Sequence, residues 1–416
     1  MKVLLTGGGT GGHLFPALAV ADALKRLSPA PDLLFVGSSS GLEATAVPQA
    51  GYAFHGLPAM SLPRRLGFRL FHAAIADTRS LFRAREILRS WKPDVIFATG
   101  GFASAPVLAA AWTLRVSVIL HEQNSVPGLT NRFASRFARE VHLAFSSARR
   151  CFPRRDHLRL TGIPLREVVL QGSRGKGLRT FRLDDDRRTV LVFGGSQGAH
   201  KINEAIVDAL PRFAGRKDVQ FVIQTGQKDY NQVLEACRDI NVRTWVRPFI
   251  VNMGDAYAVA DLVVCRAGAL TLFELAATGR PSVLVPFPFA TANHQALNAE
   301  GFVEAGASIV IPDAELKGEL LAQEIMELLD HPRRLRLMAI QAVQLARPDA
   351  TERLVRAIRR YGEEVEIVEP EPQPPPPPPQ PQRPQRQQPP PSRPEPRPGG
   401  RPPQQRRGDH VARQGS

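Results

Sequence analysis

The chain begins with a short apolar run, Lys2 to Leu5, that leads directly into Gly7-Gly8-Gly9-Thr10-Gly11-Gly12-His13. From Ala17 to Leu27 apolar residues then recur at the spacing of a helix. Glycines allow a tight turn and let backbone N–H groups approach a ligand, and the following helix favours an anionic or polar group there. This strand, glycine turn and helix predict the first unit of a parallel α/β sheet.

The same alternation of short apolar runs with helical patterns continues along the chain. In the first half we predict strands at residues 32–36, 94–98, 116–120 and 140–143, and in the second half at 189–193, 219–223, 242–246, 262–265, 282–285 and 308–311. Strands that alternate with helices form parallel sheets, so we expect two doubly wound α/β domains. Residues 171–187, rich in Gly, Arg and Asp, are the predicted linker or surface excursion between them.

Three further glycine loops follow predicted strands and precede predicted helices. They are Thr99-Gly100-Gly101-Phe102-Ala103-Ser104, Gly194-Gly195-Ser196-Gln197-Gly198-Ala199 and Arg266-Ala267-Gly268-Ala269-Leu270-Thr271. Each places backbone donors at the carboxyl end of a parallel strand, where such folds bind ligands. Any one loop is explained equally well by a tight turn, but four, two in each half, predict one ligand-binding cleft between two domains.

The composition narrows the class of protein. The 416 residues are 43% hydrophobic, so a sizeable core is expected, and the three scattered cysteines fit a reducing compartment rather than a disulfide framework. We predict neither a signal peptide nor a membrane-spanning segment. The formal net charge of +15 suits phosphorylated ligands, anionic lipid or nucleic acid without choosing among them.

Five segments together resemble the MurG-type N-acetylglucosaminyltransferases, which have the GT-B fold of two facing Rossmann-like domains. They are Gly8 to His13, His121-Glu122-Gln123-Asn124, Gly194 to Ala199, Cys265 to Thr271, and His294-Gln295 with Asn298-Ala299. The resemblance runs from about Lys2 to about Arg360. It implies an acceptor domain at 1–163, a UDP-sugar domain at 164–345 and a helix near 346–362 that packs back on the first domain.

The resemblance also implies the site residues. UDP-N-acetylglucosamine is expected in the second domain, where Glu274 would bind the ribose, Ile250 the uracil edge, and Ser196 the diphosphate. Other expected ligand contacts in this domain are Arg166, Ala269, Leu270, Thr271, Leu272, Phe273 and Gln295. Thr10, Gly11, Gly12 and Asn124 are expected to approach the sugar and acceptor from the first domain.

The expected reaction is inverting transfer of N-acetylglucosamine to a muramyl hydroxyl of an undecaprenyl-diphosphate-linked muramyl-pentapeptide. The acceptor hydroxyl must lose a proton, and a histidine is suited to take it at neutral pH, which points to His13 at the first loop. Glu122 is the competing base, if burial raises its pKa. No Asp-x-Asp motif accompanies the loops, and Asp184 to Asp186 reads as a solvated run, so we expect neither a metal nor another cofactor.

A lipid-linked acceptor implies a protein bound peripherally at the cytoplasmic face of the membrane. Residues 62–91 combine apolar and aromatic side chains with arginines, which suits an anionic lipid surface. The apolar residues are Leu66, Phe68, Leu70, Phe71, Ile75, Leu81, Phe82 and Trp91. An amphipathic helix packed on its own sheet explains most of these residues equally well.

Beyond Glu369 the chain consists mostly of Pro, Gln and Arg. Such a segment cannot bury apolar surface, so we expect residues 363–416 to form a disordered tail with polyproline II character. A solvated appendage, a docking site for a polyproline-binding partner and a basic tether to the membrane are the alternatives.

Four other functions are open to the sequence. A diacylglycerol glycosyltransferase or a nucleotide-sugar epimerase would share the donor loops, whereas a nicotinamide oxidoreductase would need its ribose-binding acid in the first domain. A nucleic-acid-binding protein would suit the basic charge, but the chain has no recognised nucleic-acid-binding motif and we expect no such partner.

Overall fold

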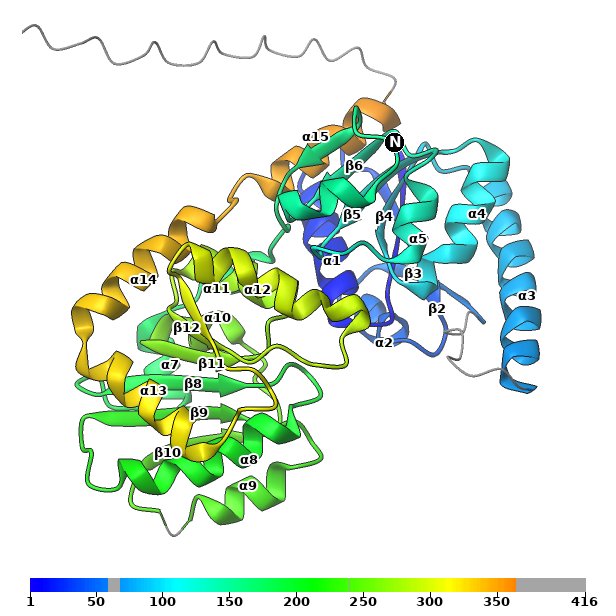
Figure 1. Cartoon of the computed structure of the whole chain (residues 1–416). Coiled ribbons are helices and arrows are strands. Elements are labelled where there is room, and N and C mark those ends of the chain that lie inside the picture. The colour runs from blue at the N-terminus through cyan, green and yellow to red at the C-terminus, as the bar shows by residue number, and fades with distance from the viewer. Residues whose placement is uncertain (59–67, 239, 364–416) are drawn as a thin grey trace, which may run out of the picture. The chain divides into compact units, whose positions relative to one another are not determined.

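The computed structural model describes residues 1–58, 68–238 and 240–363, with the backbone alone over 68–77. The predicted tail therefore lies outside the described residues, apart from Glu363. Within them the chain forms two parallel sheets, each covered by helices on both faces (Figure 1). The predicted doubly wound α/β architecture is confirmed.

The first sheet has the strand order β3-β2-β1-β4-β5-β6-β7, and all its strands are parallel. Its strands are β1 (Lys2–Gly7), β2 (Asp32–Ser38), β3 (Ala53–Leu57), β4 (Val95–Gly100), β5 (Ser117–Glu122), β6 (Glu140–Leu143) and β7 (Leu158–Leu160). The sequence did not predict β3 and β7. Both are edge strands, and their exposed, partly polar residues lack the apolar pattern of a buried strand.

Helices connect these strands. They are α1 (Gly11–Lys25), α2 (Glu43–Gln49), α3 (Phe68–Trp91), α4 (Ala105–Leu114) and α5 (Leu129–Ala134), with short 3-10 turns η1 (Phe102–Ser104) and η2 (Ser146–Cys151). Alternate strand residues feed two cores: Leu4 and Ile96 pack with α3 and α4, whereas Val3 and Leu5 pack with α1.

The second sheet has the order β10-β9-β8-β11-β12-β13, again all parallel. Its strands are β8 (Arg188–Phe193), β9 (Val219–Gln224), β10 (Arg243–Arg247), β11 (Leu262–Cys265), β12 (Ser282–Leu284) and β13 (Ser308–Val310). All six were predicted, and β8, β9 and β11 in particular are buried almost throughout and read as nearly continuous apolar runs.

The helices of this half also cover both faces of its sheet. They are α6 (Glu167–Leu170), α7 (Arg174–Thr180), α8 (His200–Ala209), α9 (Tyr230–Ala236), α10 (Met253–Val259), α11 (Ala269–Thr278), α12 (His294–Glu304), α13 (Gly318–Asp330) and α14 (Pro332–Leu345), with η3 (Leu210–Phe213) and η4 (Thr291–Asn293).

The predicted linker at 171–187 is wrong. This segment contains α7, which packs closely on α10, and Phe181 and Leu183 are buried in the core of the second half. The glycines and arginines of this segment hid its helical pattern. Gly177 allows α7 to approach Val259, because a Cβ on Gly177 would lie only 2.5 Å from a methyl carbon of that valine. The chain instead passes from the first half to the second between β7 and α6.

The four glycine loops lie at the points where the strand order of each sheet reverses. β1 pairs with β4 in the first sheet and β8 pairs with β11 in the second, and each of these strands ends in one of the loops. Ligands of doubly wound sheets bind at such switch points. The fold therefore gathers the predicted loops into two pairs.

The last described helix, α15 (Ala350–Gly362), belongs to the core of the first half. Leu354, Ala357 and Ile358 are buried with Val3 and Leu5 of β1. The chain therefore crosses between the two halves a second time, between α14 and α15.

Leu354 is fully buried, so Leu354→Ala would leave a cavity between α15 and the first sheet. We expect it to lower the free energy of unfolding by about 2–5 kcal/mol, measured by urea unfolding. Ile340→Ala on α14, where the side chain is 48% exposed, is the matched control, with an expected change below about 0.5 kcal/mol. An equal effect of the two substitutions would contradict the packing of α15.

Candidate active site

The first glycine loop and the start of α1 present His13. Its ring Nδ1 lies 3.0 Å from Thr10 Oγ1, and its carbonyl accepts a hydrogen bond of 2.8 Å from the Thr99 hydroxyl at the end of β4. Gly101 (φ +83°) allows the neighbouring loop to approach, since a Cβ there would lie 2.4 Å from the Gly8 carbonyl oxygen. Thr10 of the first loop therefore contacts the imidazole, and Thr99 holds the backbone of His13.

The His13 ring is partly exposed but has protein on most sides. This desolvation, with a smaller contribution from His294, lowers the pKa of His13 to about 4. The imidazole is therefore neutral at physiological pH and has a nitrogen able to accept a proton.

Glu122, at the end of β5, is almost completely buried. Its Oε1 accepts hydrogen bonds from the Asn124 backbone N–H (2.9 Å) and, more weakly, from the Asn124 side-chain amide (3.5 Å). Its Oε2 accepts bonds from Asn131 Nδ2 (2.8 Å) and the Gly128 N–H (3.3 Å). Burial raises the pKa of Glu122 to about 7, against the opposing effect of these bonds. The carboxyl group thus shapes the 123–131 loop.

That loop contacts the second half of the chain. Asn298 on α12 accepts a bond of 2.8 Å from the Ser125 N–H and donates one of 3.3 Å to Asn124 Oδ1. The Ser125 hydroxyl donates to the Leu297 carbonyl at 3.3 Å. Asn124 is thereby placed beside α12, the helix that carries Gln295, whose Oε1 accepts a bond of 2.9 Å from the Phe287 N–H.

In the second half, the loop after β8 is open. Ser196 is exposed, and the space around a Cβ on Gly195 is free to 4 Å. Gln224, at the end of β9, donates to the Gly195 carbonyl at 3.0 Å and accepts from the Ile250 N–H at 2.8 Å. A ligand can therefore take the Ile250 N–H only in competition with Gln224.

The start of α11 supplies a second group of donors. The first N–H groups of a helix, here those of Ala269, Leu270 and Thr271, have no partner within the helix. Further along α11, Glu274 accepts a bond of 2.8 Å from the Tyr257 hydroxyl. Burial raises the pKa of Glu274 to about 7, with Tyr257 and Arg166 opposing.

Arg166 joins the two halves from the crossing between β7 and α6. Its guanidinium lies 4.4 Å from the centre of the Phe15 ring on α1, and its charge acts on Glu274. Arg166 therefore lies close both to α1 and to the predicted ribose-binding carboxyl group.

Leu272 and Phe273, which were predicted to contact the ligand, belong to the protein interior. Leu272 is fully buried, and its N–H donates to the Gly268 carbonyl at 3.0 Å. Phe273 is buried in a cluster with Ala144 and Ile163 of the first half, and its ring lies 5.4 Å from that of Phe145. Ala269 belongs to the same cluster, so only its backbone remains for a ligand. Phe273 and Ala269 therefore fix α11 against the first half, whereas Leu272 lies in the core of the second half.

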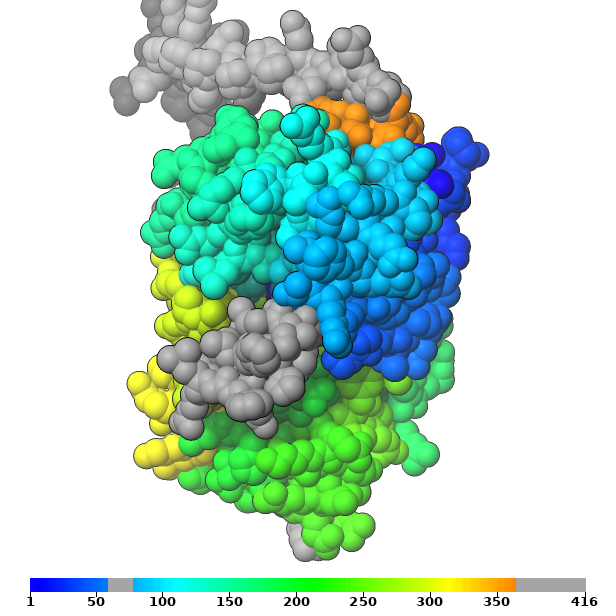
Figure 2. Space-filling view, turned by 90° about the vertical axis from the view of Figure 1, so that its right-hand side faces the viewer, coloured from blue at the N-terminus to red at the C-terminus, as the bar shows by residue number. Residues whose placement is uncertain are grey.

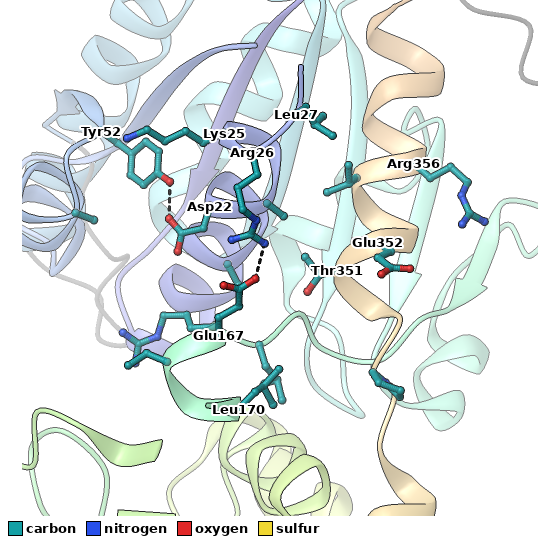
Figure 3. A pocket seen from close by; sticks show the side chains of 18 of the residues that line it. Asp22, Lys25, Arg26, Leu27, Tyr52, Glu167, Leu170, Thr351, Glu352 and Arg356 are labelled. Atoms are coloured by element: carbon teal, nitrogen blue, oxygen red, sulfur yellow. Dashed lines mark hydrogen bonds and ion pairs between the residues drawn. The ribbon is translucent and has the colours of Figure 1, made fainter. Parts of the chain in front are cut away.

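A cavity of about 880 Å³ opens between α1, the segment 165–170 and α15 (Figure 3). The ion pair between Arg26 and Glu167, 2.8 Å apart, spans it, and Tyr52 donates to Asp22 in its wall. Of the predicted site residues only Arg166 lines this cavity. Residues of both chain crossings line it, and it meets the predicted site at Arg166.

Among the described residues, no three His, Cys, Asp or Glu side chains are grouped so as to hold a metal ion. Within the same ranges, no helix has the length and apolar character needed to cross a membrane.

Two family models match the chain: the glycosyltransferase family 28 N-terminal domain over residues 3–143, and the C-terminal domain of the same family over residues 189–354. The chain belongs to glycosyltransferase family 28. Its two sheets are the two domains of the GT-B fold expected from the sequence.

The chain matches its relatives over almost the full length of each relative. A UDP-N-acetylglucosamine–N-acetylmuramyl-(pentapeptide) pyrophosphoryl-undecaprenol N-acetylglucosamine transferase of Halothermothrix orenii is 41% identical over 366 residues, 86% of this chain and 98% of the relative. The equally named protein of Moorella thermoacetica is 42% identical over 364 residues, with the same coverage. The crystal structure of Acinetobacter baumannii MurG is 30% identical with a TM-score of 0.69, covering 86% of this chain and 99% of that one.

Three structural residues of this family 28 chain escaped prediction: Glu43, Gln224 and Tyr257. Each is buried and polar, and each binds a predicted loop or side chain. Gln224 directly follows the predicted strand 219–223, which was the available signal. Tyr257 gave none, because a tyrosine in an apolar run reads as core.

Because burial keeps Glu122 protonated to about pH 7 in the folded state, against about 4.5 when unfolded, its contribution to stability is lost as pH rises between these values. Glu122→Gln imitates the neutral form, because its side-chain amide carries no charge at any pH. We expect the variant to gain stability relative to the parent from pH 4.5 to 7, by on the order of 3 kcal/mol, in urea unfolding at several pH values. A difference that does not change with pH would contradict the raised pKa.

Proposed function

We propose that the chain transfers N-acetylglucosamine from UDP-N-acetylglucosamine to the muramyl hydroxyl of undecaprenyl-diphosphate-linked N-acetylmuramyl-pentapeptide, with inversion. The observation that carries this is the identity of about 40%, over 98% of their length, to relatives named for that transfer. Because these relatives are named for a muramyl-pentapeptide acceptor, diacylglycerol is the less favoured acceptor for this chain. A UDP-N-acetylglucosamine 2-epimerase of Neisseria meningitidis has a TM-score of 0.62 but is only 12% identical, which concerns the fold alone.

The donor is assigned to the second half. The open loop at Ser196 and the free N–H groups at the start of α11 suit the diphosphate, because helix N-termini attract anions. Glu274 accepts hydrogen bonds from the two ribose hydroxyls, and Ile250 offers its backbone to the uracil. Gln295 lies on α12, beside Asn124, and binds the sugar hydroxyls together with Thr10, Gly11 and Gly12.

His13 takes the proton of the acceptor hydroxyl. The imidazole is neutral in the free protein, and the negative donor diphosphate raises its basicity once bound. Glu122 is less suited, since its two oxygens already accept hydrogen bonds inside the protein. Glu122 therefore positions Asn124 and the loop that joins the halves.

The leaving UDP gains negative charge as the sugar bond breaks. The N–H groups at the start of α11 and the charge of Arg166 stabilise it without a metal ion, since such donors are already oriented before the reaction.

The test is transfer of labelled N-acetylglucosamine from UDP to a short-chain lipid-linked muramyl-pentapeptide, with EDTA present. We expect product from the parent chain, and a kcat about 10²–10⁴-fold lower for His13→Ala, because a general base is lost. The kcat of Glu122→Gln should stay at least tenfold higher than that of His13→Ala.

Calorimetric binding of UDP-N-acetylglucosamine is the control, since His13→Ala should leave donor affinity within about twofold. Donor binding without transfer by the parent chain would reject the acceptor assignment. Equal losses in the two variants would reject His13 as the base.

We further propose that α3 and α4 form the membrane-binding face, which is turned to the viewer in Figure 2. Phe82 is 69% exposed and Trp112 57%, and an Arg85 bond to Thr113 joins the two helices. The exposed arginines around them are Arg83, Arg89, Arg115, Arg132 and Arg136. Exposed aromatic rings among arginines suit an anionic bilayer surface.

The structure modifies the predicted membrane set. Leu66 lies outside the described residues, as do the side chains of Phe68, Leu70, Phe71 and Ile75. Leu81 and Trp91 pack against the core of the first half, so they do not face a membrane. The predicted polyproline-binding partner concerns the tail, which also lies outside the described residues.

The double variant Phe82→Ala/Trp112→Ala should weaken binding to vesicles containing anionic lipid by about 10-fold or more, because two apolar anchors are lost. Sedimentation with vesicles measures this, and transfer to the short-chain acceptor should stay within about twofold. Leu337→Ala/Ile340→Ala, two exposed residues of α14, is the matched control. Equal losses in the two double variants would reject this face.

A further inference from the structure

Glu43, the first residue of α2, is a buried carboxylate beside the first glycine loop. It is 1% exposed. Its Oε1 accepts a hydrogen bond of 3.0 Å from the Ser38 N–H at the end of β2, and its Oε2 accepts one of 3.0 Å from the Gly9 N–H in the loop. The side chain therefore connects the ends of two neighbouring strands through backbone groups.

Glycines surround this carboxylate on three sides. A Cβ on Gly8 would lie 2.3 Å from the carboxyl carbon, one on Gly41 2.4 Å from Oε1, and one on Gly37 2.8 Å from Cγ. Any side chain at these positions would displace the carboxylate. The three glycines thus leave a close-fitting space for the carboxyl group of Glu43.

The equivalent loop of the second half has open space instead. Gly195 is free of neighbours where a Cβ would be, and Ser196 is exposed. In dinucleotide-binding turns such loop N–H groups receive the diphosphate of the ligand. In the first loop Glu43 already occupies the Gly9 N–H, so this donor is closed to a phosphate, whereas the loop after β8 stays accessible.

The bond to Gly9 also bears on His13. Gly9 precedes Thr10, whose hydroxyl contacts the His13 ring. On the other side, a Cβ on Gly101 would lie 2.4 Å from the Gly8 carbonyl oxygen and 3.5 Å from His13 Nδ1. Gly8, Gly101 and the imidazole are therefore packed together, and a shift of Gly8-Gly9 moves the ring.

We propose that Glu43 is a positioning residue for the transfer reaction: by accepting hydrogen bonds from Gly9 and Ser38 it fixes the first glycine loop, and through it His13, in the orientation that receives the acceptor proton. This inference rests on the proposed function, because the transfer reaction is its readout. Glu43 itself touches neither substrate.

Glu43→Gln tests the proposal, because an amide has one acceptor oxygen and turns its NH₂ group toward one of the two N–H donors. We expect kcat to fall about 10- to 100-fold, as for a displaced catalytic group, with donor affinity measured by calorimetry unchanged within about twofold. A merely structural defect would lower both together.

Gly8→Ala is the second variant, because its methyl group would push the carboxylate away without altering it chemically. We expect the same separation of kcat from donor affinity. Glu235→Gln, at a highly exposed glutamate of α9, is the matched control and should keep both values.

Two results would overturn the proposal: kcat within about twofold of the parent in both variants, or equal loss of kcat and donor affinity in both. If the parent chain binds the donor but makes no product, the proposed function fails instead, so the two failures are distinguishable.

Discussion

The site depends on the hydrogen bonds that Asn298 makes across the two halves of the chain. Asn298 is fully buried, and its amide binds both the Ser125 N–H and the Asn124 side chain. The proposed base His13 belongs to the first half and the proposed donor site to the second, so the proposed reaction requires that the two sheets keep a defined relation. Phe273 and Ala269 add an apolar contact to the same boundary. A polar and an apolar contact together fix α11 and α12 against the loop that Glu122 shapes.

Burial shifts the ionisable groups of this region toward their neutral forms. It lowers the pKa of His13 to about 4 and that of His121 to about 3, and it raises the pKa values of Glu122 and Glu274 to about 7. A site with few fixed charges and many oriented N–H groups suits a ligand that brings its own diphosphate, since bound charge is then not opposed by fixed carboxylates.

Much of the fold follows from the sequence, because strands such as β8 and β11 are buried on both faces and read as unbroken apolar runs. The glycine loops at the ends of these strands were also predicted from the sequence. What failed depends on tertiary contacts: β3 and β7 are edge strands without an apolar pattern, and residues 171–187 looked like a linker although Phe181 is buried. In the site, Glu274 is bound by Tyr257 and Asn124 by Asn298, and the ligand roles predicted for both from the motifs stay predictions. The burial of Leu272 in the core of the second half, and of Phe273 against the first half, depends on how α11 packs, and local spacing does not encode that.

The return of α15 to the first sheet has a consequence for synthesis on the ribosome. The second half is continuous in the chain and can complete its core as soon as α14 has emerged. The first half, although translated earlier, lacks Leu354, Ala357 and Ile358 until almost the end of the described chain has been made. Until α15 has been made, one apolar face of the first sheet is incompletely covered. The half that is translated first is therefore the last to finish folding.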